Sequence, residues 1–270
     1  MIRVMSFNLR YGGADDGGNS WPNRKKLAVE RIRHFDPDLL GLQECVDGEQ
    51  ASFIKTEFPD YTFFAHQRGN AERPDAEMAP LLYRRSRFER IDRGYFWLSE
   101  SPYQPGSLSW DANFARMVLW TQLRDRQTPD HVFTFLNTHF DYAPISAIES
   151  AKVLRSQLDR LKFQTPLIIA GDFNAEKDSP AYGTLVGDPY QTTDATAPGL
   201  FYDTFRDVNG YHVDEGTCHD FGRRERSTAI DWILATDHFT TLGAGIDRHQ
   251  QGELYPSDHF PIWAVVERND

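Results

Sequence analysis

The stretch Leu167-Ile168-Ile169-Ala170-Gly171-Asp172-Phe173-Asn174 gives the clearest indication of the fold. Its first four residues are uninterruptedly apolar, which predicts a buried strand. The run ends in glycine, aspartate and asparagine, which commonly form tight turns. Pro166 separates this strand from residues 145–161, where apolar residues recur at three- and four-residue steps and predict an amphipathic helix. This order of helix and strand indicates a mixed α/β protein.

Strand-like apolar runs recur along the whole chain. Residues 38–42 are nearly continuously apolar, which is typical of a strand buried on both faces. A second helix is expected at residues 24–34, behind Pro22. Many strands with few helices predict two packed sheets with helices outside, in one domain over residues 1–270. The other expected strands are residues 2–7, 62–65, 80–83, 88–98, 118–123, 132–137, 229–234 and 261–266.

The composition is that of a soluble globular protein. Of 270 residues, 40% are hydrophobic and 26% charged, which argues against disorder. No window approaches the ~18 consecutive apolar residues of a membrane helix. The chain has 29 Lys+Arg against 40 Asp+Glu, a net charge of −11, whereas a protein that coats duplex DNA is usually basic. We therefore expect neither a membrane segment nor strong duplex DNA binding, while local basic patches stay open.

Cysteine usage points to a reducing compartment. The chain has two cysteines, Cys45 and Cys218, which excludes a disulfide scaffold. Met1 is followed directly by a strand-like alternation, without the basic start, apolar region and cleavage site of a secretory signal. We expect a cytoplasmic location.

Polar side chains lie at the ends of the predicted strands. Each alone has an ordinary explanation, because such carboxylates cap helices or face water and a lone histidine is usually part of the core. Their number favours a shared site. Oxygen ligands with imidazoles, and no thiolate cluster, suit Mg²⁺ or Mn²⁺ rather than structural zinc. The residues are Asn8, Glu44, Asn137, His139, Asp172, Asn174, Asp231, Asp258 and His259.

Six motifs, in this order, resemble the endonuclease/exonuclease/phosphatase family, the deoxyribonuclease-like metal-dependent phosphoesterases. The resemblance covers residues 6–259 and implies a four-layered α/β sandwich, with two central, mostly antiparallel sheets flanked by helices. Residues 8–11 and 96–102, together with Trp21, further resemble a bacterial branch with nocturnin-like character. The motifs are Ser6-Phe7-Asn8, Leu42-Gln43-Glu44, Asn137-Thr138-His139, Gly171-Asp172-Phe173-Asn174, Ile230-Asp231-Trp232 and Ser257-Asp258-His259.

The resemblance implies metal-assisted hydrolysis of a phosphate ester. Glu44 would be the principal metal ligand, with Asn8 beside it and Asp258 acting on the same ion directly or through water. One or two Mg²⁺ or Mn²⁺ ions are expected. A second ion would take Asp172, Asn174 and His259.

The same resemblance implies catalytic roles. Asp172 would position and deprotonate the attacking water, and Asn174 would hold that water or the phosphate. His259 would contact the phosphate, oriented by Asp231, because a carboxylate on the far ring nitrogen favours the imidazolium. His139 would be the second imidazole.

Three further residues are assigned by the resemblance. Glu77 would pair with His139, although its loop departs from the usual form and a surface acid is the alternative. Arg116 would be the phosphate-side arginine, with simple pairing to Asp111 as the alternative. Asn137 would bond the phosphate through its amide.

The sequence favours a small or single-stranded substrate. The run Arg223-Arg224-Glu225-Arg226 is either a solvated face or a basic rim that attracts an anion. Tyr11, Trp21, Trp110 and Phe114 either stack on a ring or pack in the core. Because no long basic track is present, we expect a phosphomonoester or a small or single-stranded phosphodiester, such as a nucleotide, a sugar phosphate or single-stranded nucleic acid.

Two alternatives remain at this point. One is a nuclease, either an exonuclease of deadenylase type or an endonuclease. The other is a non-enzymatic binding module that kept the scaffold. Such a module predicts lost site residues, and here all the motif residues are present.

Overall fold

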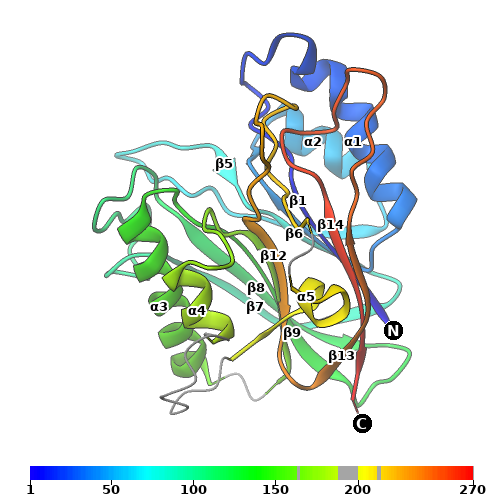
Figure 1. Ribbon diagram of the computed structural model, residues 1–270. Coiled ribbons are helices and arrows are strands. Elements are labelled where there is room, and N and C mark those ends of the chain that lie inside the picture. Colours follow the sequence, from blue (N-terminus) through cyan, green and yellow to red (C-terminus); the bar gives the residue numbers. More distant parts are fainter. Residues whose placement is uncertain (163–164, 188–199, 212–213, 270) are drawn as a thin grey trace.

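The computed structural model describes residues 1–162, 165–187, 200–211 and 214–269. Within these ranges two six-stranded sheets face one another, with helices on the outer side of each (Figure 1). The predicted sandwich of helix-flanked sheets is confirmed. Both sheets are mostly antiparallel, and each contains one parallel pair. Among the described residues, no helix is long and apolar enough to cross a membrane.

The first sheet has the strand order β13-β14-β1-β2-β6-β4. Its parallel pair, β1 and β2, is connected by α1, which begins with Pro22 at its second position as the sequence predicts. Met5 and Leu40 of this pair pack outward against Ile32 of α1 and Ile54 of α2. The elements are β1 (Ile2–Asn8), α1 (Trp21–Phe35), β2 (Leu39–Gln43), α2 (Glu49–Glu57), β4 (Tyr61–Phe64), β6 (Leu81–Arg84), β13 (Phe239–Ile246) and β14 (Ile262–Arg268).

The second sheet has the order β11-β12-β10-β9-β8-β7. Its parallel pair, β9 and β10, is connected by α3. Ala151, Leu154 and Leu158 of α3 pack on this sheet as predicted, whereas Ile145 is exposed. The elements are β7 (Phe88–Trp97), β8 (Met117–Asp125), β9 (Val132–His139), α3 (Pro144–Leu161), β10 (Leu167–Asp172), α4 (Pro180–Val186), β11 (Tyr202–Asp203), α5 (Thr204–Asn209) and β12 (Asp231–Ala235).

The interior between the sheets explains the apolar run at residues 167–170. Successive side chains of a strand point to opposite faces. Ile168 and Ala170 therefore pack toward the first sheet, while Leu167 and Ile169 pack under α3 and α4. Both faces of β10 are buried, so neither can carry polar residues until the strand ends.

The two parallel pairs determine where polar strand ends meet. Parallel neighbours end at the same edge of a sheet, where α/β proteins commonly bind ligands. Asn8 ends β1 next to Gln43 of β2, and His139 ends β9 next to Asp172 of β10. A hydrogen bond from Asn8 to Asp172 joins the two edges across the sandwich.

Candidate active site

Two carboxylates from opposite sheets meet at one amide. The Asn8 Nδ2 group donates to Glu44 Oε1 at 3.0 Å and to Asp172 Oδ2 at 2.9 Å. Asp172 is buried, and Glu44 is partly exposed and also accepts the backbone N–H of Tyr11 at 2.8 Å. Within the described ranges no Lys or Arg nitrogen lies within 4.0 Å of either carboxylate. No Lys or Arg side chain therefore compensates the negative charge of the pair, and the nearest cationic group to Asp172 is the His259 ring, 3.9 Å from its Oδ2.

Left-handed backbone conformations orient the side chains of Glu44 and Asn174. Glu44, directly after β2, has φ 56°, and Asn174, after β10, has φ 47°. Asparagine tolerates this left-handed region, whereas glutamate rarely adopts it. Such residues cost about 1–3 kcal/mol each and are concentrated at functional sites. The turn at Glu44 is therefore held by its surroundings rather than by its own preference.

His139 lies between the carboxyl groups of Glu77, its predicted partner, and Asp172, for which no such contact was predicted. Its Nε2 is 3.5 Å from Asp172 Oδ2, and its Nδ1 is 3.5 Å from Glu77 Oε1. The Asn174 amide lies 3.1 Å from the same Nε2. Burial, with the positive charge of Arg116, lowers the pKa of His139 to about 3. His139 is consequently neutral at physiological pH.

His259, unlike the neutral His139, is protonated. Its Nδ1 is 2.8 Å from Asp231 Oδ2, and its Nε2 is 3.9 Å from Asp172 Oδ2. Burial disfavours the charged ring, but the Asp231 carboxylate outweighs it and raises the pKa of His259 well above 6.5. The Thr217 hydroxyl accepts the backbone N–H of Asp231 at 3.3 Å. The site therefore combines a neutral imidazole with an imidazolium.

Among the residues that the structure describes, two sets of side chains could hold a metal ion. In each set, one ligand atom per residue lies within 4.8 Å of the others. The set Glu44, His139 and Asp172 fits a divalent cation, because no Lys or Arg of the described ranges pairs with its carboxylates and its own imidazole is neutral. The set Asp172, Asp231 and His259 already contains the positive charge of His259, so it fits a cation less well.

Asp258 is placed at the side of this centre and outside both sets. Its Oδ1 accepts the Ser257 hydroxyl at 3.1 Å, and its Oδ2 is 3.6 Å from Arg10 Nη1. Arg10 in turn binds both oxygens of Asp16, at 3.1 and 3.0 Å. Burial raises the pKa of Asp258 against the effect of His259. Arg10 thus compensates the negative charge of Asp258.

Glu77 and Arg116 are both buried, which contradicts the surface alternative for Glu77. Glu77 Oε1 contacts Arg68 Nη1, Arg116 Nη1 at 3.4 Å and His139 Nδ1. Arg116 Nε lies 3.7 Å from Asp141 Oδ2, and not near Asp111. Asp111 instead accepts two backbone N–H groups at the start of α3.

Asn137 has a different task from the predicted phosphate contact. Its Oδ1 accepts from Gln43 Nε2 at 2.8 Å, and its Nδ2 donates to the carbonyls of Leu42 at 2.8 Å and Pro80 at 2.9 Å. The amide therefore bridges the two sheets below the site and has no free donor. A Cβ on Gly41 would lie 2.4 Å from Asn137 Oδ1, so glycine makes this approach possible.

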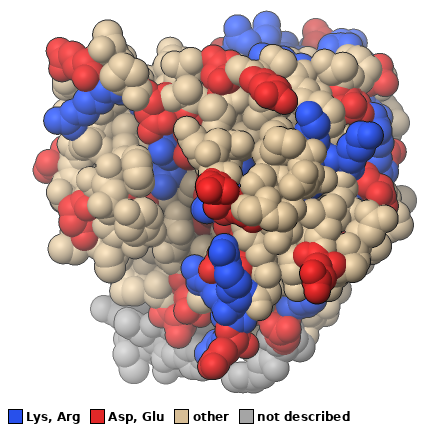
Figure 2. Space-filling view, turned by 90° about the horizontal axis from the view of Figure 1, so that it is seen from above, with Lys and Arg blue, Asp and Glu red and all other residues tan. Residues whose placement is uncertain are grey.

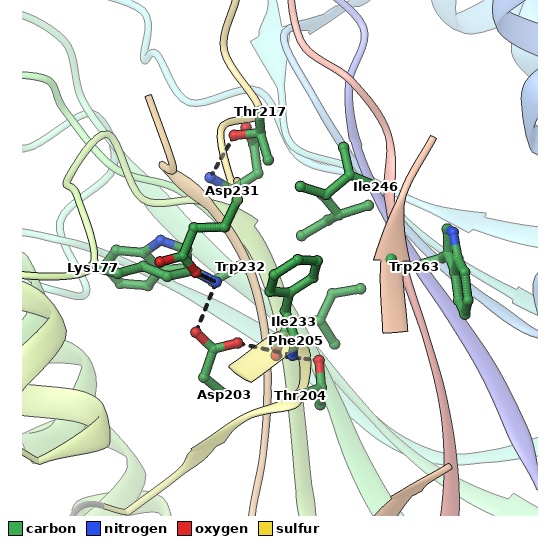
Figure 3. A pocket seen from close by; sticks show the side chains of 13 residues that line it. Lys177, Asp203, Thr204, Phe205, Thr217, Asp231, Trp232, Ile233, Ile246 and Trp263 are labelled. Atoms are coloured by element: carbon green, nitrogen blue, oxygen red, sulfur yellow. Dashed lines mark hydrogen bonds and ion pairs between the residues drawn. The ribbon is translucent and has the colours of Figure 1, made fainter. Parts of the chain in front are cut away.

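A buried ion cluster lies behind Asp231 (Figure 3). Lys177 Nζ binds Asp203 Oδ2 at 2.8 Å and Glu215 Oε2 at 2.9 Å, and Arg206 Nη2 binds Glu215 Oε1 at 2.5 Å. The cavity beside it measures about 10 Å³, which is space for about one water. The cluster thus braces the segments that carry Asn174 and Thr217. A second cavity, of about 540 Å³, is lined in part by Lys177, Arg206 and Glu215.

The face that carries the strand ends is hollowed between two raised regions, and acidic and basic side chains alternate on it (Figure 2). It shows no continuous basic track. Arg223 is exposed and pairs with Asp220 at 2.6 Å, and residues 224–226 are exposed. Of the four predicted stacking rings, Trp21 is buried in the core, whereas Tyr11, Trp110 and Phe114 are exposed.

Sequence reasoning missed several contributors to the site. Arg10, Gln43 and Asp141 each bind a predicted site residue. Arg68 and Lys177 come from loops without periodic pattern. Gln43 belongs to a motif, and Arg10 and Asp141 each lie two residues beyond a motif residue, so these three had a signal.

Comparisons with known proteins identify relatives of the whole chain. The model of the "Endonuclease/Exonuclease/phosphatase family" matches residues 5–259. A Bacteroides vulgatus structure described as endonuclease/exonuclease/phosphatase is 28% identical, with 99% of each chain covered and a TM-score of 0.87. A mannosyl-6-phosphatase from Bacteroides thetaiotaomicron VPI-5482 is 26% identical, with 99% of this chain and 100% of that one covered and a TM-score of 0.84.

The predicted nocturnin-like branch gains no specific support. The human nocturnin catalytic domain with bound sulfate is 18% identical, with 99% of this chain and 94% of that one covered and a TM-score of 0.75. At that identity the likeness establishes a common fold only.

Proposed function

Because this chain belongs to the endonuclease/exonuclease/phosphatase family, we propose that it is a divalent-metal-dependent phosphoesterase. Its substrate would be a phosphomonoester or a small or single-stranded phosphodiester, hydrolysed by attack of water. The observation that carries this proposal is the convergence of Glu44 and Asp172 on the Asn8 amide, with no Lys or Arg against them in the described residues. Carboxylates so placed repel one another unless a cation or a proton lies between them.

Glu44, Asp172 and the neutral His139 would hold one Mg²⁺ or Mn²⁺, with Asn8 orienting both carboxylates. When bound, such an ion neutralises phosphate oxygens and orients the ester. A second ion has less support, since His259 already carries positive charge beside Asp231. Asp258 lies outside this set and pairs with Arg10 at 3.6 Å, so its predicted action on the ion, directly or through water, has less support.

The side chains around this position have complementary tasks. Asp172 is the group that takes a proton from water, because burial and Asp231 raise the pKa of its carboxyl. Its Oδ1 accepts the Asn174 backbone N–H at 2.9 Å, which fixes its orientation. The imidazolium of His259 donates to a phosphate oxygen, and Asp231 keeps it charged. Glu77 Oε1 faces the far nitrogen of His139 at 3.5 Å and favours a proton on it.

The choice of a phosphomonoester follows from likeness to the mannosyl-6-phosphatase and from the mixed charge of the site face. A nuclease is the alternative, and a binding module fits poorly because the motif carboxylates and imidazoles converge. The cytoplasmic location, the single domain over residues 1–270 and weak duplex DNA binding stay predictions.

The decisive experiment is a phosphoester panel with Mg²⁺ and Mn²⁺ and a chelator control. We expect turnover that the chelator abolishes. Glu44→Ala should weaken metal binding, whereas His259→Ala should cut turnover and leave the metal bound. Full activity of both variants would contradict the assigned roles. Rapid nicking of supercoiled plasmid at physiological salt, or release of mononucleotides from an RNA oligomer, would favour the nuclease.

A further inference from the structure

Two exposed aromatic rings lie side by side near the site. Phe114 is 41% exposed and Tyr142 is 56% exposed, and their ring centroids are 6.4 Å apart. Single exposed aromatics are common and need no explanation. These two rings belong to different segments of the chain, and the same buried residue fixes both segments.

That residue is Asp141, which is fully buried. Its Oδ2 accepts the backbone N–H groups of Phe114 at 3.0 Å and Asn113 at 3.2 Å, and its Oδ1 accepts that of Ala143 at 3.0 Å. These bonds lower the pKa of the Asp141 carboxyl in spite of its burial. Tyr142 lies between Asp141 and Ala143 in the chain. Both rings therefore project from backbone that is held before any ligand arrives.

The Phe114 ring is also connected to the reacting centre. The guanidinium carbons of Arg68 and Arg116 lie 4.7 and 5.5 Å from its centroid. Both guanidinium groups contact Glu77, whose Oε1 faces His139. One part of the ring thus rests on cations that belong to the site, and the rest is open to solvent. A rigid, open aromatic surface is what base and sugar rings stack on.

We propose that Phe114 and Tyr142 bind the alcohol half of the phosphate ester, and that this half carries a flat or apolar ring face, either a nucleobase or a pyranose. The inference rests on the proposed function and narrows its substrate class. It predicts that recognition of the ring is separable from hydrolysis of the phosphate. Phe114 and Tyr142 contribute to substrate affinity and take no part in the proton transfers of Asp172 and His259.

The test uses three monoesters of primary alcohols, so that the leaving groups are similar: adenosine 5′-monophosphate, mannose 6-phosphate and glycerol 3-phosphate. Steady-state kinetics are measured with Mg²⁺ for the wild type, Phe114→Ala, Tyr142→Ala and Phe114→Tyr. We expect Phe114→Ala to raise KM for a ring ester about fivefold, the low end of the range for loss of one stacked ring. kcat should stay within about twofold, and kcat/KM for glycerol 3-phosphate should stay unchanged. Phe114→Tyr should restore the wild-type KM.

Tyr103→Ala is the matched control. Tyr103 is also exposed and also lies against an arginine, with the guanidinium carbon of Arg160 4.9 Å from its ring. Its hydroxyl binds Gln157, which is 11 residues beyond Ser146 on α3 and therefore about 16 Å from the end of the helix that Asp111 contacts. This variant should leave KM unchanged for all three esters.

The outcomes separate the two proposals. The ring inference would be wrong if Phe114→Ala and Tyr142→Ala left the turnover of ring esters unchanged. It would also be wrong if kcat/KM for glycerol 3-phosphate fell by the same factor. In either case the proposed phosphoesterase function would stand. If the wild type hydrolysed none of the three esters in a chelator-sensitive manner, both the ring inference and the proposed phosphoesterase function would be wrong for monoesters. Selective loss with one ring ester identifies that ring, base or pyranose, as the ligand.

Discussion

Glu44 carries its function in a conformation that its own side chain disfavours. Its φ of 56° would cost a glycine little, because glycine has no Cβ to clash in the left-handed region. Glu44→Gly removes a metal ligand and relieves this strain together with the repulsion from Asp172. We expect the Glu44→Gly protein to lose metal-dependent activity. Its free energy of unfolding should equal that of the Glu44→Gln protein or exceed it by up to about 1 kcal/mol.

Urea unfolding of both variants in the presence of chelator measures this difference. Glu44→Gln is the control because it removes the charge and keeps the backbone strain. A Glu44→Gly protein clearly less stable than Glu44→Gln would show that the turn after β2 is not strained.

Gly41 is required by the amide that bridges the sheets. An added Cβ would meet Asn137 Oδ1 at 2.4 Å and Ala170 Cβ at 3.1 Å. We expect Gly41→Ala to lower the free energy of unfolding by about 1–3 kcal/mol, the usual cost of overpacking a core. Gly183→Ala in α4 is the control, since nothing lies within 4 Å of its added Cβ, and it should be neutral or stabilising by up to about 1 kcal/mol. Equal stabilities in urea unfolding would contradict the bridge.

The sequence locates most site residues because each lies at or beside one end of a buried strand. It misassigns Asn137 because position along the strand determines depth as well as face. Asn137 and His139 share one face of β9, but Asn137 lies two residues earlier, about 7 Å deeper between the sheets. Arg68 and Asp141 escape prediction because a loop residue acquires its partner only through tertiary structure.

At the level of elements, β-α-β units bring the site together twice. β1-α1-β2 and β9-α3-β10 each deliver adjacent parallel strand ends. These strands are predictable because burial of both faces leaves a continuous apolar run. Both crossover helices are predictable because burial of one stripe leaves apolar residues at three- and four-residue steps. The missed elements α2, α4 and α5 have only 9, 7 and 6 residues. β13 was missed because its glycines and threonines give no alternation and its pairing has a bulge.

Removal of one member of the ion cluster behind Asp231 should be strongly destabilising. Lys177 is nearly fully buried between Asp203 and Glu215, so Lys177→Met leaves buried carboxylates with less compensation. We expect a loss of about 3–5 kcal/mol in the free energy of unfolding. Lys152→Met is the matched control: Lys152 pairs with Glu149 at 2.7 Å on the surface of α3 and should contribute less than about 1 kcal/mol. Similar losses for the two variants in urea unfolding would contradict the importance of burial.

The same cluster should shape stability in acid. Burial opposes ionisation of Glu215, but Arg206 and Lys177 outweigh it and lower the pKa of its carboxyl. A pKa lowered by folding gives stability that is present above the unfolded value, about 4.3, and is lost as the pH falls through the folded value. We expect Glu215→Gln to destabilise most at pH 7 and progressively less below about pH 4.

Thermal unfolding of the wild type and Glu215→Gln between pH 3 and 7 measures this effect. A difference in Tm that is constant over this range would show that the Glu215 charge does not stabilise the fold. The control is Glu225→Gln, an exposed carboxylate that should leave the Tm unchanged at every pH.

At the scale of the whole molecule, binding of a cation should stabilise the fold. A ligand that binds only the native state raises stability by about 2.7 kcal/mol at a hundred times its Kd. We expect Mg²⁺ or Mn²⁺ to raise the Tm of the chelator-treated protein, and Glu44→Gln to abolish this rise. Because the net charge is −11, any salt also screens repulsion, so KCl of equal ionic strength is the necessary control. A rise in Tm that KCl reproduces would exclude specific binding.

The reacting groups are divided between the two halves of the sandwich, with Asn8 on one and His139, Asp172 and Asp231 on the other. Neither half contains a working set by itself, so a partly folded chain with a single formed sheet is chemically inert. Hydrolytic competence should therefore emerge late in folding, at the moment when the halves dock. Recovery of turnover during refolding would then report that docking event, after backbone spectroscopic signals have already risen.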